Sequence, residues 1–133
     1  NSCVLLFDEN LVLNIEYDPA DERLVFSVYL DEIPEQNAEP LLRELLAANL
    51  YWYRTGGATL SLEEGTGGII LAYPRRVDDI DSTKLETIVQ NILEQAEKWR
   101  TRIARHKEAA TTGGPDADSA LANEPSGGRI IFG

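Results

Sequence analysis

The chain has 133 residues, with 23 acidic against 12 basic side chains, one cysteine and one histidine. This length allows one domain with a small core. A net charge of −11 argues against binding a nucleic-acid backbone or an anionic membrane, since both require clustered Lys and Arg. The sequence contains no membrane-spanning apolar run or signal segment, and one cysteine forms no internal disulfide, so we expect a protein of the reducing cytoplasm.

The negative charge is concentrated at the start of the chain. Residues 1–53 carry 11 acidic and 2 basic side chains, a net charge of −9. Two interpretations fit this distribution: a solvated face that keeps a small protein soluble, or a face complementary to a basic partner.

The first three predicted elements are β-strands. Residues 4–7 form a short apolar run, which Cys3 opens, and we expect that cysteine to be buried as a small hydrophobe. Residues 11–17 and 23–30 alternate apolar and polar side chains with a period of two, and a turn at 18–21 separates them. The pattern predicts an antiparallel hairpin with one short strand before it.

A helix over residues 40–50 follows, because Pro40 suits the first turn of a helix and leucines recur on adjacent rows after it. The glycine pair at 56–57 ends the helix after the aromatic cluster of Tyr51, Trp52 and Tyr53. These three side chains do not all fit inside a small core. The cluster therefore predicts a homodimer contact, with packing in the chain's own core as the alternative.

The remaining pattern predicts a second hairpin from residues 58–62 and 69–73, with Pro74 ending the pairing. An amphipathic helix then runs from about residue 81 to about 107. Asp81, Ser82 and Thr83 are all able N-caps for it, and Thr83 with Glu86 fits a capping box. Residues 1–109 thus form one domain, and the Gly/Pro/Ser-rich tail 110–133 is expected to be mobile. The fold class is α+β, an antiparallel twisted β-sheet flanked by helices.

The sequence predicts no catalytic, cofactor or metal site. His106 lies far in sequence from Cys3, so no nucleophile and base are paired. The acidic residues 78–81 are explained by helix capping and solvation of a loop. A phosphate-binding glycine-rich loop leads into the N-terminus of a helix, whereas the glycine-rich turn 65–68 joins two strands. We therefore expect a binding protein and no enzyme.

The order of the predicted elements and three local signatures carry a resemblance to a known family. Residues 45–52, Leu-Leu-Ala-Ala-Asn-Leu-Tyr-Trp, and residues 56–60, Gly-Gly-Ala-Thr-Leu, resemble the core of the Tir chaperone (CesT) family, the acidic class I chaperones of bacterial type III secretion. Residues 73–80 and 85–100 are similar to that family's last strand junction and closing helix. The resemblance implies a homodimer without enzymatic activity that keeps the N-terminal chaperone-binding segment of an effector extended and secretion-competent. The secretion ATPase is a candidate further partner.

The resemblance also implies two sets of site residues. The middle helix and the following strand would form the dimer interface, through Leu42, Leu45, Leu46, Asn49, Trp52, Leu60 and Leu62. The sheet would bind the effector segment, in part by adding it as an edge strand, with the candidates Val4, Leu6, Val12, Val25 and Tyr29.

Two departures from the family pattern accompany the resemblance. The family begins with a helix before its first strand, and no residues before Asn1 supply it, so we expect that helix to be missing upstream or absent from this member. In the tail, one interpretation is that residues 129–132 dock into an apolar groove of their own dimer or of a neighbouring molecule, as an imitation of effector, and packing in a crystal is the alternative. The rival interpretation is a regulatory or stress-response domain with the same dimeric fold and no effector client.

Overall fold

The structure, a computed structural model, describes residues 2–7 and 10–112, so the predictions for residues 113–133 lie outside the described part. The order of elements is the predicted one. It runs β1 (Ser2–Phe7), β2 (Leu11–Asp18), β3 (Arg23–Glu32), α1 (Glu39–Ala48), the 3₁₀ segment η2 (Leu50–Thr55), β4 (Thr59–Glu63), β5 (Gly68–Arg76), the short 3₁₀ turn η3 (Val77–Asp79) and α2 (Ser82–Thr112).

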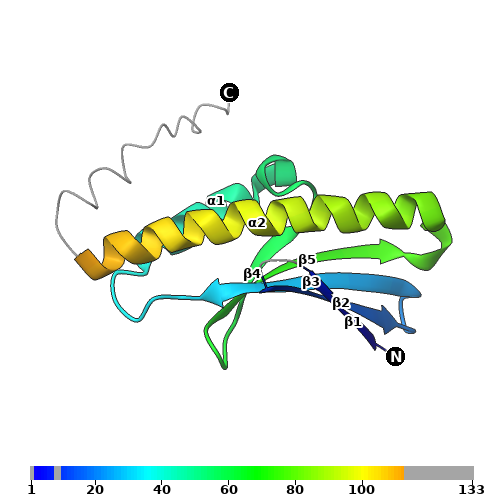
Figure 1. Ribbon diagram of the computed structural model, residues 1–133, viewed down its shortest axis with the longest axis horizontal. Coiled ribbons are helices and arrows are strands. Elements are labelled where there is room, and N and C mark those ends of the chain that lie inside the picture. The colour runs from blue at the N-terminus through cyan, green and yellow to red at the C-terminus, as the bar shows by residue number, and fades with distance from the viewer. Residues whose placement is uncertain (1, 8–9, 113–133) are drawn as a thin grey trace.

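The five strands form one antiparallel sheet in the order β1-β2-β3-β5-β4, which makes β1 and β4 its two edges. Both long helices lie over the same face of this sheet (Figure 1). The predicted α+β class with an antiparallel sheet is therefore confirmed. Within the part of the chain that the structure describes, the helices leave the second face of the sheet without a covering layer.

The core lies between the helices and the sheet. Alternate residues of the inner strands point toward the helices, as their period of two predicts, and α2 packs over β3 and β5. Residues of α2 at spacings of three and four meet them, including Trp99, which is 1% exposed. The largest fully buried side chains are Trp99, Phe26, Leu13, Leu41, Ile69, Leu71, Ile92, Ile103 and Val28.

The sequence pattern places Leu42, Leu45, Leu46 and Leu50 on adjacent rows of the helix, but α1 packs on a different row. Leu41, Leu45 and Ala48 are buried against the rest of the chain, whereas Leu46 and Leu50 are exposed. The regular helix also ends at Ala48, earlier than expected, and the aromatic cluster lies on η2. The sequence did not determine which side of α1 faces the core, because apolar side chains occupy several neighbouring positions of the helix. A row of leucines fits a core and an interface equally well.

The second hairpin, β4 with β5, stops pairing at Ala72, before Pro74, as predicted, but Pro74 does not end the strand, because β5 continues to pair with β3 as far as Arg76. Strand β4 pairs only with residues 68–72, so beyond that point β5 has a free outer edge. Proline, which donates no hydrogen bond to a ladder, is tolerated on such an edge.

One of the three predicted N-caps of α2 is confirmed. The carboxylate of Asp81 accepts a hydrogen bond from the backbone N–H of Lys84 at 2.8 Å, so Asp81 caps α2, whereas the predicted capping box is wrong because Thr83 lies inside the helix. At its other end α2 reaches Thr112, beyond the predicted end.

Cys3, expected to be buried, is exposed. It pairs with Ile15 on the helix-covered side of the edge strand β1, but α2 lies over β3 and β5, so little covers Cys3 there.

Candidate protein-binding surfaces

The five residues predicted to contact an effector all lie on the sheet face that the helices leave open, hereafter the open sheet face. The register places Leu6 opposite Val12 on neighbouring strands, and Val25 and Tyr29 follow on β3 with the same parity. Val4 is 57% exposed and Leu6 is 78% exposed, whereas Val12 and Val25 are partly buried by their neighbours. The structure therefore brings together residues that are up to 25 positions apart in the sequence.

Tyr29 has a defined place on this face. A Cβ atom added to Gly68 would lie 2.6 Å from Cε2 of Tyr29, so the ring packs directly over the glycine backbone. Loss of water contact, followed by the nearby carboxylates of Glu32 and Asp31, raises the pKa of the Tyr29 hydroxyl. The hydroxyl is thus neutral at physiological pH and can donate a hydrogen bond to a bound chain.

Strand β1 forms an edge of the sheet to which another strand could pair. It pairs with β2 on one side, and among the described residues no strand pairs with its other side. Its sequence from Cys3 to Phe7 is apolar and contains no proline. An unpaired edge of this kind is a template for a further strand.

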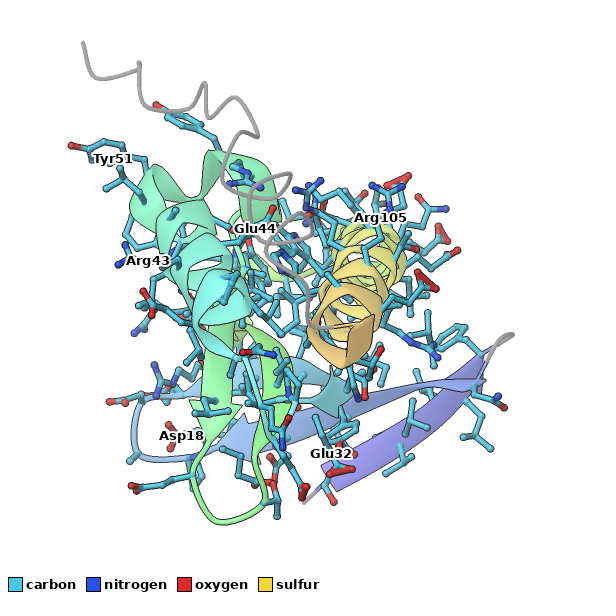
Figure 2. The ribbon with its side chains drawn as sticks, turned by 90° about the vertical axis from the view of Figure 1, so that its left-hand side faces the viewer. Asp18, Glu32, Arg43, Glu44, Tyr51 and Arg105 are labelled. Atoms are coloured by element: carbon cyan, nitrogen blue, oxygen red, sulfur yellow. The ribbon has the colours of Figure 1, made fainter. Side chains whose placement is uncertain are left out.

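A second apolar surface, hereafter the aromatic surface, lies where α1, η2 and β4 adjoin. Tyr51 points away from the sheet at this end of the molecule (Figure 2). The side chains of the aromatic surface are exposed by about half or more, and they are Leu46 (73%), Leu50 (56%), Tyr51 (68%), Trp52 (51%), Tyr53 (86%) and Leu62 (48%). The prediction that the aromatic cluster does not all point inward is confirmed.

The backbone of the aromatic surface is strained. Tyr51 and Trp52 both have φ of 58°, in the left-handed region that bulky residues rarely adopt. Such a conformation costs on the order of 1 kcal/mol or more per residue and persists only where the surroundings enforce it.

Hydrogen bonds at both ends of η2 hold that conformation. The Asn49 side chain donates to the carbonyl of Leu60 at 2.9 Å and accepts from its N–H at 2.8 Å, which ties the end of α1 to β4. The fully buried hydroxyl of Thr55 donates to the carbonyl of Ala58 at 2.5 Å. Both ends of η2 are therefore fixed by side chains bonding to backbone.

Helix α2 holds η2 from the other side. Lys98 Nζ and Trp99 Nε1 donate to the carbonyl oxygen of Arg54 at 2.6 and 3.2 Å, and Asn91 Nδ2 donates to that of Gly56 at 3.0 Å. Gly56 has φ of 64°, and a Cβ there would lie 2.8 Å from Nε2 of Gln95. Only glycine fits this close approach without a shift.

Glu44 on α1 links that helix to η2 and α2 through charged hydrogen bonds. Its side chain, 12% exposed, accepts hydrogen bonds from Arg54 at 2.6 Å, Arg102 at 2.5 Å and His106 Nε2 at 2.6 Å, between α1 and α2 (Figure 2). Burial alone would raise the pKa of this carboxyl, but the hydrogen bonds from His106, Arg102 and Arg54 outweigh it and hold the pKa at about 2. His106 is thus a buried partner of a carboxylate.

The predicted dimer residues divide into three groups. Leu46, Trp52 and Leu62 are exposed on the aromatic surface, and Leu42 and Asn49 are partly buried. Leu45 and Leu60, at 6% and 5% exposure, belong to the chain's own core and support that surface from beneath. Sequence reasoning missed Glu44, because its partners Arg102 and His106 lie 58 and 62 positions away and no local pattern signals the pairing.

Within residues 2–7 and 10–112, no three His, Cys, Asp or Glu side chains are grouped as a metal ion would require. None of the helices in that part of the chain combines the length and apolar character needed to cross a membrane.

The fold and its surfaces define a class: a small α+β protein whose exposed apolar surfaces, an open sheet face with a free edge and an aromatic surface on the helix side, are suited to binding other chains. More specifically, the chain belongs to the Tir chaperone protein (CesT) family, whose sequence profile matches residues 1–100. The resemblance inferred from the sequence is thereby confirmed.

Known proteins agree with this assignment. A Tir chaperone of Citrobacter freundii is 28% identical over 95 residues, which are 71% of this chain and 60% of that relative. The chain therefore spans about 60% of the length of that relative.

Solved structures share the fold at lower sequence identity. A chain of the ExsC–ExsE complex matches with a TM-score of 0.65 and 22% identity, covering 76% of this chain and 74% of that one. A chain of the HopA1–SchA chaperone–effector complex gives 0.64 and 24%, covering 75% of each. The ExoU–SpcU complex of the type III secretion system of Pseudomonas aeruginosa gives 0.62 and 17%, covering 79% and 81%.

Proposed function

We propose that this protein is a type III secretion chaperone of the bacterial cytoplasm that binds the N-terminal chaperone-binding segment of an effector and keeps it extended and secretion-competent. The observation that carries the proposal is the open sheet face, where Val4, Leu6, Val12, Val25 and Tyr29 lie beside the unpaired edge of β1. Family membership supports it, as do the similar folds found in complexes such as HopA1–SchA, which is described as a chaperone–effector complex.

In this proposal, main-chain hydrogen bonds supply most of the affinity for a client, and side-chain contacts supply the selectivity. A client segment that adds a strand to β1 gains main-chain hydrogen bonds, which tolerate many sequences. Alternate side chains of that segment then lie on the open sheet face, where exposed aliphatic groups and the Tyr29 ring select for apolar residues. The client remains extended because strand pairing holds its backbone, so it stays competent for passage through a narrow export channel.

The aromatic surface supports a second part of the proposal, that the chaperone is a homodimer. Exposed aromatic and leucine side chains on a strained, firmly held backbone form a surface built in advance for a partner. A two-fold symmetric contact would use the same surface on both copies. In this scheme Leu46, Trp52 and Leu62 contact the second copy, with Leu42 and Asn49 at the margin and Leu45 and Leu60 behind them.

The proposed chaperone acts by binding alone, without enzymatic activity or a cofactor. The secretion ATPase is a candidate partner at the delivery step. The rival function, a regulatory or stress-response domain with the same dimeric fold, predicts no client at all.

Co-expression with the N-terminal segments of candidate secreted proteins tests the proposal. A tagged chain should retain one or more of these segments on an affinity column, and limited proteolysis of the complex should spare a client segment that is cleaved when free. Retention of no segment by a folded chain would contradict the proposal and favour the regulatory domain.

A further inference from the structure

Basic residues gather at one place on this otherwise acidic chain. A pocket of about 400 Å³ lies between η2 and α2, lined by Arg54, Lys98, Trp99, Thr101, Arg102 and Arg105. Four of these six residues carry a positive charge, although the chain as a whole has a net charge of −11. We refer to this site as the basic pocket.

The basic pocket lies on the opposite side of the molecule from the open sheet face. Arg105 projects from α2 away from the sheet (Figure 2). Lys98, Arg102 and Arg105 are spaced four and three residues apart, so they share one side of α2. A ligand in the basic pocket and a client on the sheet would therefore not compete for space.

The positive charge of the pocket is only partly neutralised. Arg54 and Arg102 share the single carboxylate of Glu44. Lys98 donates to a neutral carbonyl, that of Arg54, and neither Lys98 nor Arg105 forms an ion pair with a carboxylate of the described residues. Burial, together with the repulsion of Arg54 and Arg102, lowers the pKa of Lys98, as expected where positive charge is in excess.

The buried ring of Trp99 lies beneath the cationic groups of Arg54 and Lys98. Its ring centre lies 5.3 Å from the guanidinium carbon of Arg54 and 5.4 Å from Nζ of Lys98. Because the indole is 1% exposed and bonded through Nε1 to the Arg54 carbonyl, the two cations are held over a fixed surface. The pocket is thus ordered before any ligand binds.

We propose that the basic pocket binds the carboxylates of an acidic segment of a protein partner. From Lys98 to Arg105 the cations extend over about 10 Å of helix, a row suited to several carboxylates on one chain rather than to a single small anion. The fork of Arg105 and the ammonium of Lys98 supply the unneutralised donors, and the buried Trp99 ring beneath Arg54 and Lys98 keeps those two side chains in place. This site is additional to the proposed client surface and does not depend on it.

A labelled oligoglutamate peptide tests the proposal, with fluorescence anisotropy of the full chain as the readout and an oligoglutamine peptide as the uncharged control. We expect saturable binding of oligoglutamate only, weakened by added salt. The double variant Lys98→Gln with Arg105→Gln should lose at least ~tenfold in affinity, because it removes both unneutralised cations and leaves Glu44 paired.

The matched control removes the same charge elsewhere, through Lys84→Gln with Arg76→Gln, and should change the affinity by less than about twofold. The charge-conserving variant Lys98→Arg with Arg105→Lys should retain binding. Circular dichroism checks that each double variant is folded. Absence of binding, an equal loss in both Gln variants, or inorganic phosphate binding as tightly as the peptide would overturn the proposal. Client retention should be unchanged in the single variant Arg105→Gln, which leaves the Lys98 bond to the Arg54 carbonyl in place, and this separates the proposal from the chaperone proposal.

Discussion

The two apolar surfaces of this chain are built in opposite ways. The open sheet face consists of regular strand residues in ordinary conformations beside an unpaired backbone edge. The aromatic surface stands on two residues with φ of 58° and is tied down by side-chain bonds from α1, η2 and α2. One surface offers main-chain pairing to any extended segment, and the other offers a fixed shape.

This difference matches two different tasks. A surface that must accept an unfolded client gains from backbone bonds that are indifferent to sequence. A surface that must recognise one constant partner, a second copy of the chain, gains from a shape set in advance, because less entropy is lost on binding. In the proposed scheme, the strain at Tyr51 and Trp52 therefore serves the proposed dimer contact and not client binding.

The largest expected effect comes from breaking the aromatic surface. Leu46→Asp places a charge at a side chain that is 73% exposed in the single chain, so folding should be unaffected. In a dimer the buried, unpaired charge should cost about 3–5 kcal/mol and shift the molecule to monomers at micromolar concentration. Sedimentation equilibrium measures this, with Leu6→Asp as the control that should stay dimeric. A stable dimer of Leu46→Asp would contradict the interface assignment.

Acid should loosen the aromatic surface and spare the sheet. The pKa of Glu44 is about 2 in the folded chain, below its ordinary value of 4.5. Its stabilisation is therefore fully present above pH ~4.5 and is lost as the pH falls through about 2, with a total of at most about 3 kcal/mol.

Urea unfolding at stepped pH measures that loss. The free energy of unfolding of the wild type should exceed that of Glu44→Gln near neutral pH, and the two should converge toward pH 2. A constant difference across this range would mean that the carboxylate of Glu44 does not depend on its three partners.

A smaller effect is expected on the open sheet face. Leu6→Asp puts a charge where the client's apolar side chains would pack, and should weaken client binding by about tenfold to a hundredfold. The matched control is Leu5→Asp, the same change one residue earlier on the opposite face of β1, where Leu5 pairs with Leu13. The control should lower stability and leave the affinity nearly unchanged. An equal loss of affinity in both variants would place the client elsewhere.

The smallest effect measures the strain itself. In the Leu46→Asp background, Tyr51→Asn should raise the free energy of unfolding relative to Tyr53→Asn by about 1 kcal/mol, because Asn tolerates a left-handed φ. Each variant removes one ring of the same pair, whose centres lie 6.3 Å apart, so the difference isolates the backbone. Equal stabilities in urea unfolding would show that Tyr51 is not strained.

The sequence predicted most of the sheet because its signal is local. Residues 11–17 and 23–30 alternate cleanly, and β2 and β3 pair as a hairpin in the structure. The same alternation placed Val12, Val25 and Tyr29 opposite the core, so the open sheet face was predictable before its strands were arranged.

The helix side was predicted less well because its order depends on contacts far apart in the sequence. The exposed cluster at 51–53 was predicted from its bulk, but the left-handed backbone beneath it depends on Asn49, Thr55 and groups on α2 that no local pattern reveals. The continuation of β5 past Pro74 and the exposure of Cys3 were missed for a related reason. Whether a strand is an edge, and which part of it a helix covers, is decided by the whole sheet.

Backbone hydrogen exchange tests most directly the central claim that an extended client pairs with the open sheet face and its edge. Adding a retained client segment should slow exchange in β1 and leave η2, Leu50–Thr55, unchanged. Slower exchange in η2 with no change in β1 would contradict the claim and exchange the roles of the two surfaces.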